Sequence, residues 1–370
     1  MRIAAVSLSE LRLPLVRPFE TSFGRMTARD LILVKVEDAS GAAGWGECVA
    51  DADPFYSAET SMTAWPILER YLIPPVLGSA LDTAAEVSAR WTSVRGHQMA
   101  KAALEMALWD LQARILGRPL CELLGATARP IASGVSIGIQ ASPDALVARV
   151  AEERAAGYQR IKIKIKPGWD REPVEAIRAR FPDLPLMVDA NAAYTLADAG
   201  RLEALDRFNL MMIEQPLSYD DLVRHAELQR RLQTPICLDE SIHSPEAAAD
   251  ALDLGACRII NIKPGRLGGF GPSLAVHDLA RARGIPVWHG GMLESGIGRA
   301  HNLHLSTLPG FTLPGDVAAS RRYFVPDLID PPIDVRPDGT IDVPPGPGIG
   351  VVPEQERVTS AAVRTARFRA

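Results

Sequence analysis

The chain has 370 residues, with 47% hydrophobic and 23% charged side chains, and 40 basic against 45 acidic groups give a net charge of −5. This size allows two domains, or one large barrel with an appendage. The slight acidic excess argues against a nucleic acid or an anionic membrane as the main partner, because either would require a basic face. No apolar run approaches the roughly 18 residues of a membrane helix, and no signal-peptide core is present, so we expect a cytoplasmic protein.

The first 125 residues have the pattern of an α+β domain. Residues 11–16 and 30–37 read as strands, and residues 42–48 complete a hairpin after the turn DASG. The sequence MAKAALEMALWDLQARILG, residues 99–117, predicts a helix that ends at its glycine. Strands followed by segregated helices favour a separate domain over residues 1–125.

Residues 126–323 alternate short apolar strands with amphipathic helices. The predicted strands are SGVSIGI, RIKIKIK, PLMVDAN, LMMIEQP, PICLDES, RIINIKP, PVWHGGM and a weak last one near FTLPGD. About eight such units fit a closed parallel barrel, and the Gly-rich phosphate loop typical of an open doubly wound sheet is missing. The Pro- and Gly-rich segment 324–370 is expected to leave the barrel and pack back on the N-terminal domain. The four cysteines form no pattern of metal ligands or disulfides and are predicted to be buried thiols.

Charged residues end these strands at a nearly constant interval. Lys164, Asp189, Glu214 and Asp239 follow one another at intervals of 25 residues, and Lys263 comes 24 residues later. Such a period indicates a repeated strand–helix unit. Because the carboxyl ends of parallel barrel strands open on one mouth, we expect these side chains to lie together.

The three acids predict a metal site. A single strand-end acid is usually a helix cap or a surface ion pair, but Asp189, Glu214 and Asp239 on successive strands would repel one another in a partly desolvated mouth unless a cation joined them. Oxygen ligands without histidine or cysteine select a hard ion, so we expect Mg²⁺. A carboxylate substrate bound to that ion would have its α-proton acidified.

The stretch RIKIKIKPGWD places three isoleucines on one strand face and three lysines on the other. We predict that Lys164 and Lys263 lie on opposite sides of the bound substrate and act as bases, since nearby cations lower a lysine pKa. Lys162 is expected to hold a substrate carboxylate. Lys166, beyond the strand end, is predicted to be a solvated bystander.

The chain resembles the muconate-lactonizing-enzyme subgroup of the enolase superfamily in three features: KIK at 162–164, the three acids, and IKPG at 262–265. The use of a lysine base with Mg²⁺ is an established pattern of that superfamily. The resemblance spans nearly the whole chain and implies a modified (β/α)₇β barrel under a capping domain. The longer motifs GYQRIKIKIKPGWD, QTPICLDESI, NIKPGRLGG, GIPVWHGGMLESGIGR and LPGDVAAS are similar to the group of o-succinylbenzoate synthases and N-succinylamino acid (N-acylamino acid) racemases.

This resemblance implies an enediolate mechanism that dehydrates a precursor to o-succinylbenzoate, for menaquinone synthesis, or racemises N-acyl amino acids. It also implies Mg²⁺, with Mn²⁺ or Co²⁺ as substitutes, and a homo-oligomer, either a dimer or an octamer. Alternatives within the subgroup are a cycloisomerase and a dipeptide epimerase, although the Asp-x-Asp pair of the epimerases is reduced here to Asp316. Alternatives outside it are a metal-assisted hydrolase and a non-catalytic barrel.

The resemblance also implies a substrate pocket that the capping domain covers. Phe19, Phe23 and Phe55 are expected to form an apolar lid, although isolated aromatics are more often core residues. The barrel would contribute the residues Ser136, Asn191, Gly291, Met292 and Leu293.

Three further residues carry open alternatives. Arg266 either lowers the pKa of Lys263, favouring racemisation, or simply pairs with Asp239 or Glu240. Asp51 stands where the family pattern has an apolar lid residue. His289 stands where that pattern has a small residue, and a strand-end histidine is a possible alternative base.

Overall fold

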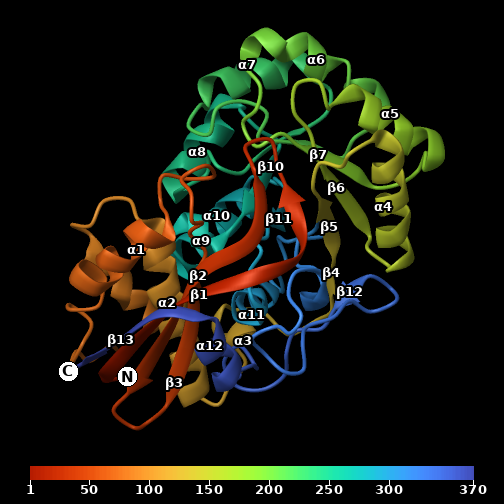
Figure 1. Cartoon of the computed structure of the whole chain (residues 1–370). Helices are drawn as coiled ribbons and strands as arrows, with labels where there is room; N and C mark the ends of the chain where they lie inside the picture. The colour runs from red at the N-terminus through yellow and green to blue at the C-terminus, as the bar shows by residue number, and fades with distance from the viewer.

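The computed structural model describes all residues, 1–370, as two large sheets and a small two-stranded one, with their helices. The first is an antiparallel sheet of order β13-β1-β2-β3. Its strands are β1 (Ile3–Glu20), β2 (Arg25–Asp38), β3 (Ala43–Cys48) and β13 (Ala362–Arg369). The long β1–β2 hairpin extends from this sheet toward the barrel (Figure 1), and its tip brings residues 20–25 to the barrel mouth.

The helices of the capping domain pack on one face of this sheet. They are α1 (Ser61–Ile67), α2 (Gln98–Ile115) and α3 (Leu120–Leu123), with a π-helical turn at Leu68–Leu72 and a 3₁₀ segment at Ala84–Trp91. The helix predicted at 99–117 is therefore confirmed within two residues. It lies so close to β3 that a Cβ at Gly46 would collide with the backbone oxygen of Ala103.

The C-terminal segment returns to the N-terminal sheet. β13 pairs antiparallel with β1, and the backbone amide of Ala370 donates to the carbonyl of Ala4 at 3.0 Å. Both chain ends consequently lie side by side on the capping domain (Figure 1). Before this, β12 (Thr340–Ile341) pairs with β4 (Ile131–Ala132) near the barrel, and α12 (Gln355–Ala361) precedes β13.

The second sheet is parallel, and its strands follow chain order from β5 to β11. They are β5 (Gly134–Ile137), β6 (Arg160–Lys164), β7 (Leu186–Asp189), β8 (Ile213–Glu214), β9 (Ile236–Leu238), β10 (Ile259–Ile262) and β11 (Val287–His289). Segment 311–315 forms single parallel bridges to Val287 on one side and to Ser133 on the other. It occupies the eighth position of the barrel without forming a regular strand, as the weak last strand predicted there suggests.

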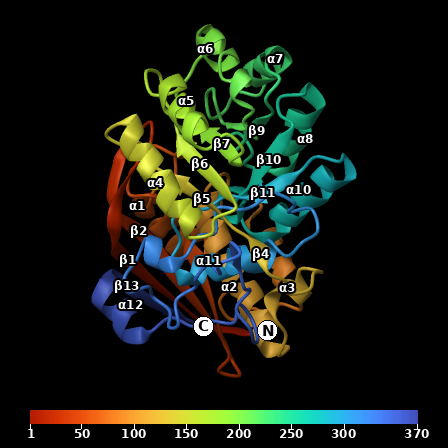
Figure 2. The ribbon, with the colours of Figure 1, turned by 90° about the vertical axis from the view of Figure 1, so that its right-hand side faces the viewer.

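Helices cover the outside of the curled sheet (Figure 2). They are α4 (Pro143–Ala155), α5 (Arg171–Arg180), α6 (Ala199–Glu203), α7 (Val223–Arg231), α8 (Pro245–Leu254), α9 (Pro264–Leu267), α10 (Phe270–Ala282) and α11 (Gly296–Leu305). None of them is long and apolar enough to cross a membrane. All four cysteines are buried and free, which confirms that prediction.

Strand alternation divides the barrel into an outer and an inner set of side chains. Ile161, Ile163 and Ile165 are buried in the large apolar core that includes the surrounding helices. Inside the barrel, a small separate cluster forms an apolar layer: Met187, Met212, Cys237, Ile259 and Trp288. Because successive side chains on a strand alternate, the residue two positions further along each strand lies above this layer, at the mouth.

Candidate active site

The three predicted acids lie side by side at the barrel mouth. In the strand register Lys164 is opposite Asp189, and Asp189 is opposite Glu214. Asp239 follows the end of β9, the strand that pairs with β8. The exposed fraction of each acid is at most 1%, so the three carboxylates share one desolvated environment.

Two lysines of β6 contact these acids. Lys164 Nζ lies 2.6 Å from Asp189 Oδ2 and 2.7 Å from Asn191 Oδ1. Lys162, one pleat deeper, lies 2.9 Å from Glu214 Oε2 and 2.6 Å from Asp316 Oδ2, with its ammonium 4.9 Å from the centre of the Trp288 ring. Both lysines are buried and point into the barrel. Lys166 is 38% exposed and reaches only the half-exposed Glu20 at 3.8 Å.

The other side of the mouth carries Lys263, directly after β10. Its Nζ lies 2.7 Å from Asp239 Oδ2 and 3.2 Å from the phenol oxygen of Tyr56, which comes from the capping domain. Burial lowers the pKa of Lys263, but neighbouring groups, Asp239 above all, more than offset this and raise it above the ordinary value. Arg266 acts in the opposite direction on that pKa and itself pairs with Asp239. The pairing of Arg266 with Asp239 is therefore present, whereas the lowered pKa expected for Lys263 is not, because the carboxylate of Asp239 outweighs the nearby cation.

The electrostatics of the acids fit a divalent cation. Burial, followed by the charge of Asp189, raises the pKa of Glu214 above its ordinary value, whereas Lys164 and Lys162 hold the pKa of Asp189 below it in spite of burial. In the present side-chain conformations, the structure contains no group of three acidic, histidine or cysteine side chains arranged to bind a metal ion. Each of the three acids instead contacts a lysine. The donor set is nevertheless all oxygen, and a positive ion would relieve the repulsion that raises the pKa of Glu214. Asp189, Glu214 and Asp239 would hold Mg²⁺.

Neighbouring polar side chains fix the orientation of the acids. Asn261 Nδ2 donates to Glu214 Oε1 at 2.6 Å, and the backbone amide of Asp239 donates to Gln215 Oε1 at 3.0 Å. Asn191, with a positive φ of 44°, accepts a hydrogen bond from Lys164 and donates one to Glu240 Oε1 at 3.0 Å. The second oxygen of Glu240 is buried without a hydrogen-bond partner.

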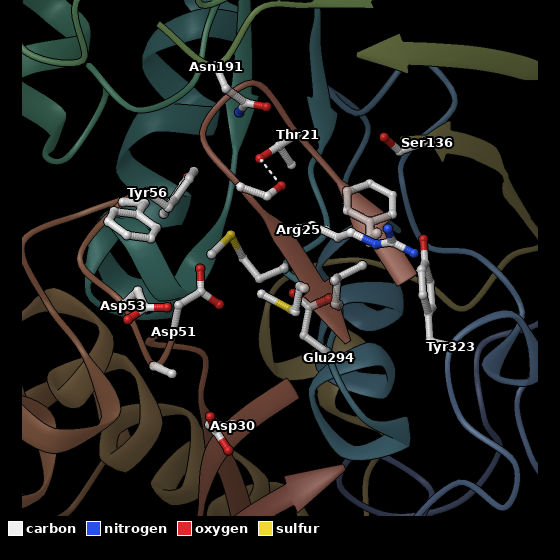
Figure 3. Close-up of a pocket in the computed structure, with 18 of the residues that line it drawn as sticks. Thr21, Arg25, Asp30, Asp51, Asp53, Tyr56, Ser136, Asn191, Glu294 and Tyr323 are labelled. Atoms are coloured by element: carbon white, nitrogen blue, oxygen red, sulfur yellow. Dashed lines mark hydrogen bonds between the residues drawn. The ribbon is translucent and has the colours of Figure 1, made fainter. Parts of the chain in front are cut away.

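A cavity of about 440 Å³ opens above these groups, between the barrel and the capping domain (Figure 3). Most of the predicted pocket and catalytic residues line this cavity. They are Phe19, Phe23, Phe55, Asp51, Ser136, Lys162, Lys164, Asn191, Lys263, Gly291, Met292 and Leu293. The rings of Phe23 and Phe55 pair at 6.3 Å between centroids, joining two capping-domain loops across the opening. The hydroxyl of Ser136 is buried without a protein partner.

One sequence-based expectation needs correction, and a second residue that departs from the family pattern has an additional contact. His289 does not reach this cavity: it pairs with Ile262 in the strand register, so its ring lies on the outward side of β11, lines a second cavity and stacks on Phe311. Burial lowers the pKa of His289 to about 3, so the ring is neutral. The hypothesis that His289 acts as an alternative base is therefore wrong. Asp51, at a position where an apolar residue was expected, does line the cavity, but it also forms an ion pair with the buried Arg29.

Sequence reasoning missed several residues of the site. Tyr56 directly follows Phe55, a predicted lid residue, yet nothing in the sequence separated it from its neighbours. Asp316 was considered only as a possible ammonium ligand, whereas both of its oxygens are engaged, by Arg160 and Lys162. Glu294 and Tyr323 also line the cavity.

Comparisons with known proteins define the class of this site. The mandelate racemase/muconate lactonizing enzyme N-terminal domain model matches residues 4–125, and the enolase C-terminal domain-like model matches residues 145–357. The chain therefore belongs to the enolase superfamily and is an enzyme, which confirms the resemblance and the α/β fold expected from it.

Particular relatives narrow the comparison. The chain is 54% identical to an o-succinylbenzoate synthase of Geobacillus kaustophilus, with 97% of this chain and 95% of the relative covered. It is 50% identical to an N-succinylamino acid racemase of Amycolatopsis, covering 98% and 99%. A solved enolase-superfamily structure from Listeria innocua superimposes with a TM-score of 0.96 at 38% identity, covering 100% of this chain and 99% of the other.

Proposed function

We propose that the protein removes the proton α to a carboxylate and returns it, racemising N-acyl amino acids such as N-succinyl amino acids, and that the same site can dehydrate a precursor to o-succinylbenzoate. The observation that carries this is the approach of Lys164 from β6 and Lys263 after β10 to one cavity, with Asp189 and Asp239 beside them. Two bases that flank one substrate carbon can exchange protons on its opposite faces.

Each residue near the substrate has a distinct proposed task. Lys164 removes and returns the proton on one face, and Lys263 does so on the other. Lys162, held by Glu214 and Asp316, keeps its charge and binds a substrate carboxylate oxygen. Mg²⁺, or Mn²⁺ or Co²⁺ in its place, held by the three acids, would stabilise the negative charge that develops on the substrate carboxylate. Dehydration requires only Lys164 as a base, with Lys263 as electrostatic support.

The relatives support both reactions, because the names of the two described above are those of a synthase and a racemase. A dipeptide epimerase is disfavoured by Asp316, since ion pairs with Arg160 and Lys162 leave it unsuited to hold a substrate ammonium group. A cycloisomerase remains the second candidate within the subgroup, since the chain is 31% identical to a muconate cycloisomerase of Rhodococcus opacus. We further propose that the protein forms a homo-oligomer.

The decisive experiment is proton exchange in ²H₂O. With Mg²⁺ and a panel of N-succinyl amino acids, NMR should show loss of the α-proton signal and equilibration of the two enantiomers. Lys164→Ala should abolish racemisation and dehydration, whereas Lys263→Ala should abolish racemisation and leave exchange with one enantiomer only. An ultraviolet assay of o-succinylbenzoate formation measures the dehydration. Absence of exchange over the whole panel would rule out the racemase proposal.

A further inference from the structure

A second cavity lies on the outward side of the barrel wall, apart from the substrate cavity. It has a volume of about 340 Å³, and residues of β4, β11, the turn after α11 and the irregular segment 311–315 line it. Its lining shares no residue with that of the substrate cavity. Cavities of this volume are large enough to hold a small organic molecule.

The imidazole of His289 lines this cavity without a protein partner. Its exposed fraction is 1%, and neither ring nitrogen makes a hydrogen bond. Each of the other buried histidines uses at least one ring nitrogen: His225, His277, His301 and His304. Because burial keeps the ring of His289 neutral, it offers one N–H donor and one acceptor. Unpaired buried polar groups are unfavourable, so this side chain indicates a bound molecule that pairs with it.

Arg129 gives the same cavity a positive charge. Its guanidinium donates only to backbone carbonyls, among them those of Thr307 at 3.2 Å and Ser306 at 3.1 Å, and these bonds leave Nη1 free. No acidic residue lines the cavity. Because Arg129 is exposed and His289 is buried, the guanidinium lies toward the open end and the imidazole toward the closed end. The open end therefore favours an anionic group.

The rest of the lining is largely apolar. Ile131, Phe311 and Leu313 contribute to it, and the ring of Phe311 stacks on His289 at 6.0 Å between centroids. An apolar wall with a few polar groups is the usual composition of a small-molecule site, and an aromatic ring suits a flat apolar body. The lining has one histidine and no cysteine or acid, so it does not supply the ligands of a metal ion.

We propose that this cavity is a second binding site, for a small carboxylate that has an apolar body and a hydroxyl group. Arg129 binds the carboxylate through Nη1, and the hydroxyl pairs with His289. A hydroxyl group both donates and accepts, as a neutral imidazole does, so either tautomer of the ring finds a partner. Because the two cavities share no residue, this site does not depend on the proposed racemase function.

The test compares three probes of similar shape. The NMR signal of the Ile131 methyl group, in the complete protein, reports binding at this cavity, because Ile131 does not line the substrate cavity. 4-Hydroxybenzoate should bind about tenfold or more tightly than 4-hydroxybenzamide, which lacks the charge, and about threefold or more tightly than benzoate, which lacks the hydroxyl. Arg129→Gln should remove the first difference, and His289→Leu should remove the second.

Arg95→Gln is the matched control, since Arg95 is an exposed arginine of the capping domain outside the cavity, and it should leave both differences unchanged. His289→Leu should not lower the melting temperature, because it replaces an unpaired polar group with an apolar one. If that variant does not fold, the exposed Arg129 still tests the site. Equal affinity for the carboxylate and the amide would overturn the proposal. A signal that no probe shifts saturably would also overturn it, since the cavity would then hold water only.

Discussion

The phenol of Tyr56, on a capping-domain loop, donates a hydrogen bond of 3.0 Å to Oδ1 of Asp239 at the end of β9. The phenol oxygen of Tyr56 in turn accepts a hydrogen bond from Lys263 Nζ at 3.2 Å. The position of the capping loop and the orientation of a proposed metal ligand and a proposed base are therefore coupled. The loop that covers this side of the cavity therefore also completes the polar network of the barrel mouth.

Tyr56→Phe should lower kcat/KM by about tenfold or more, because a hydrogen bond to a charged group contributes roughly 1.5–3 kcal/mol. The ring keeps its packing, so thermal unfolding should shift only by the few degrees that the lost hydrogen bond accounts for. Steady-state kinetics and circular dichroism measure the two effects. Tyr219→Phe, at an exposed tyrosine, is the control and should change neither kcat/KM nor the melting temperature. Unchanged kinetics in Tyr56→Phe would show that the loop contact has no role in the reaction.

Removal of divalent ions should abolish activity, and Mg²⁺, Mn²⁺ or Co²⁺ should restore it. Glu214→Gln should raise the Mg²⁺ concentration needed for half-maximal activity by roughly 10–100-fold, because it removes one of three charged ligands. Binding of an ion to the folded state should also raise the melting temperature of the wild type. If Mg²⁺ shifts the melting of the variant and of the wild type equally, Glu214 is not a ligand.

The stability of the protein should fall as the pH rises from about 4.5 to 7 through Glu47. This carboxyl joins β3 to the start of α11, where Ser295 and Gly298 donate backbone N–H groups to it. Burial, with the nearby Glu294 contributing, raises the pKa of Glu47 from 4.5 to about 7. Because the folded state then holds a proton that the unfolded state has released, unfolding free energy should decrease by about 3 kcal/mol over this range.

Denaturant titrations at pH 4.5 and 7.5 measure this change, and Glu47→Gln isolates the contribution of this carboxyl from those of other acids. The wild type should lose more stability than the variant between the two pH values. Equal losses in both proteins would mean that Glu47 does not hold the extra proton.

Gly290→Ala should destabilise the protein by about 1–3 kcal/mol and reduce activity, since overpacking in a dense interior carries this cost. A Cβ at Gly290 would overlap the side-chain amide of Asn261 and lie 2.6 Å from Cε of Lys263. The substitution should therefore displace a proposed base as well as a side chain that orients Glu214. Gly284→Ala, at a glycine with open space around it but a positive φ, serves as the comparison. It should lower stability without lowering kcat.

The spacing of strand-end charges was enough to predict the barrel and the meeting of Lys164, Asp189, Glu214, Asp239 and Lys263. The reason is that parallel strands repeat a single geometry, so a constant interval in sequence becomes a constant position at the mouth. The alternation of RIKIKIK likewise determined which side chains of β6 face inward. His289 shows the limit of such reasoning, because a strand-end position indicates the layer of a residue but not which face of the strand it occupies when the strand is only three residues long.

The partners from elsewhere in the chain were decided only by the tertiary structure. Tyr56 reaches Asp239 from a loop 183 positions away, and Asp316 reaches Lys162 from the irregular eighth segment of the barrel. No periodicity relates these residues, since loops carry no repeating geometry from which a contact could be calculated. The sequence by itself determined the chemical groups that each strand brings to the mouth. The fold of the capping domain over that mouth decided which of its residues line the cavity there, among them Tyr56 and Asp51.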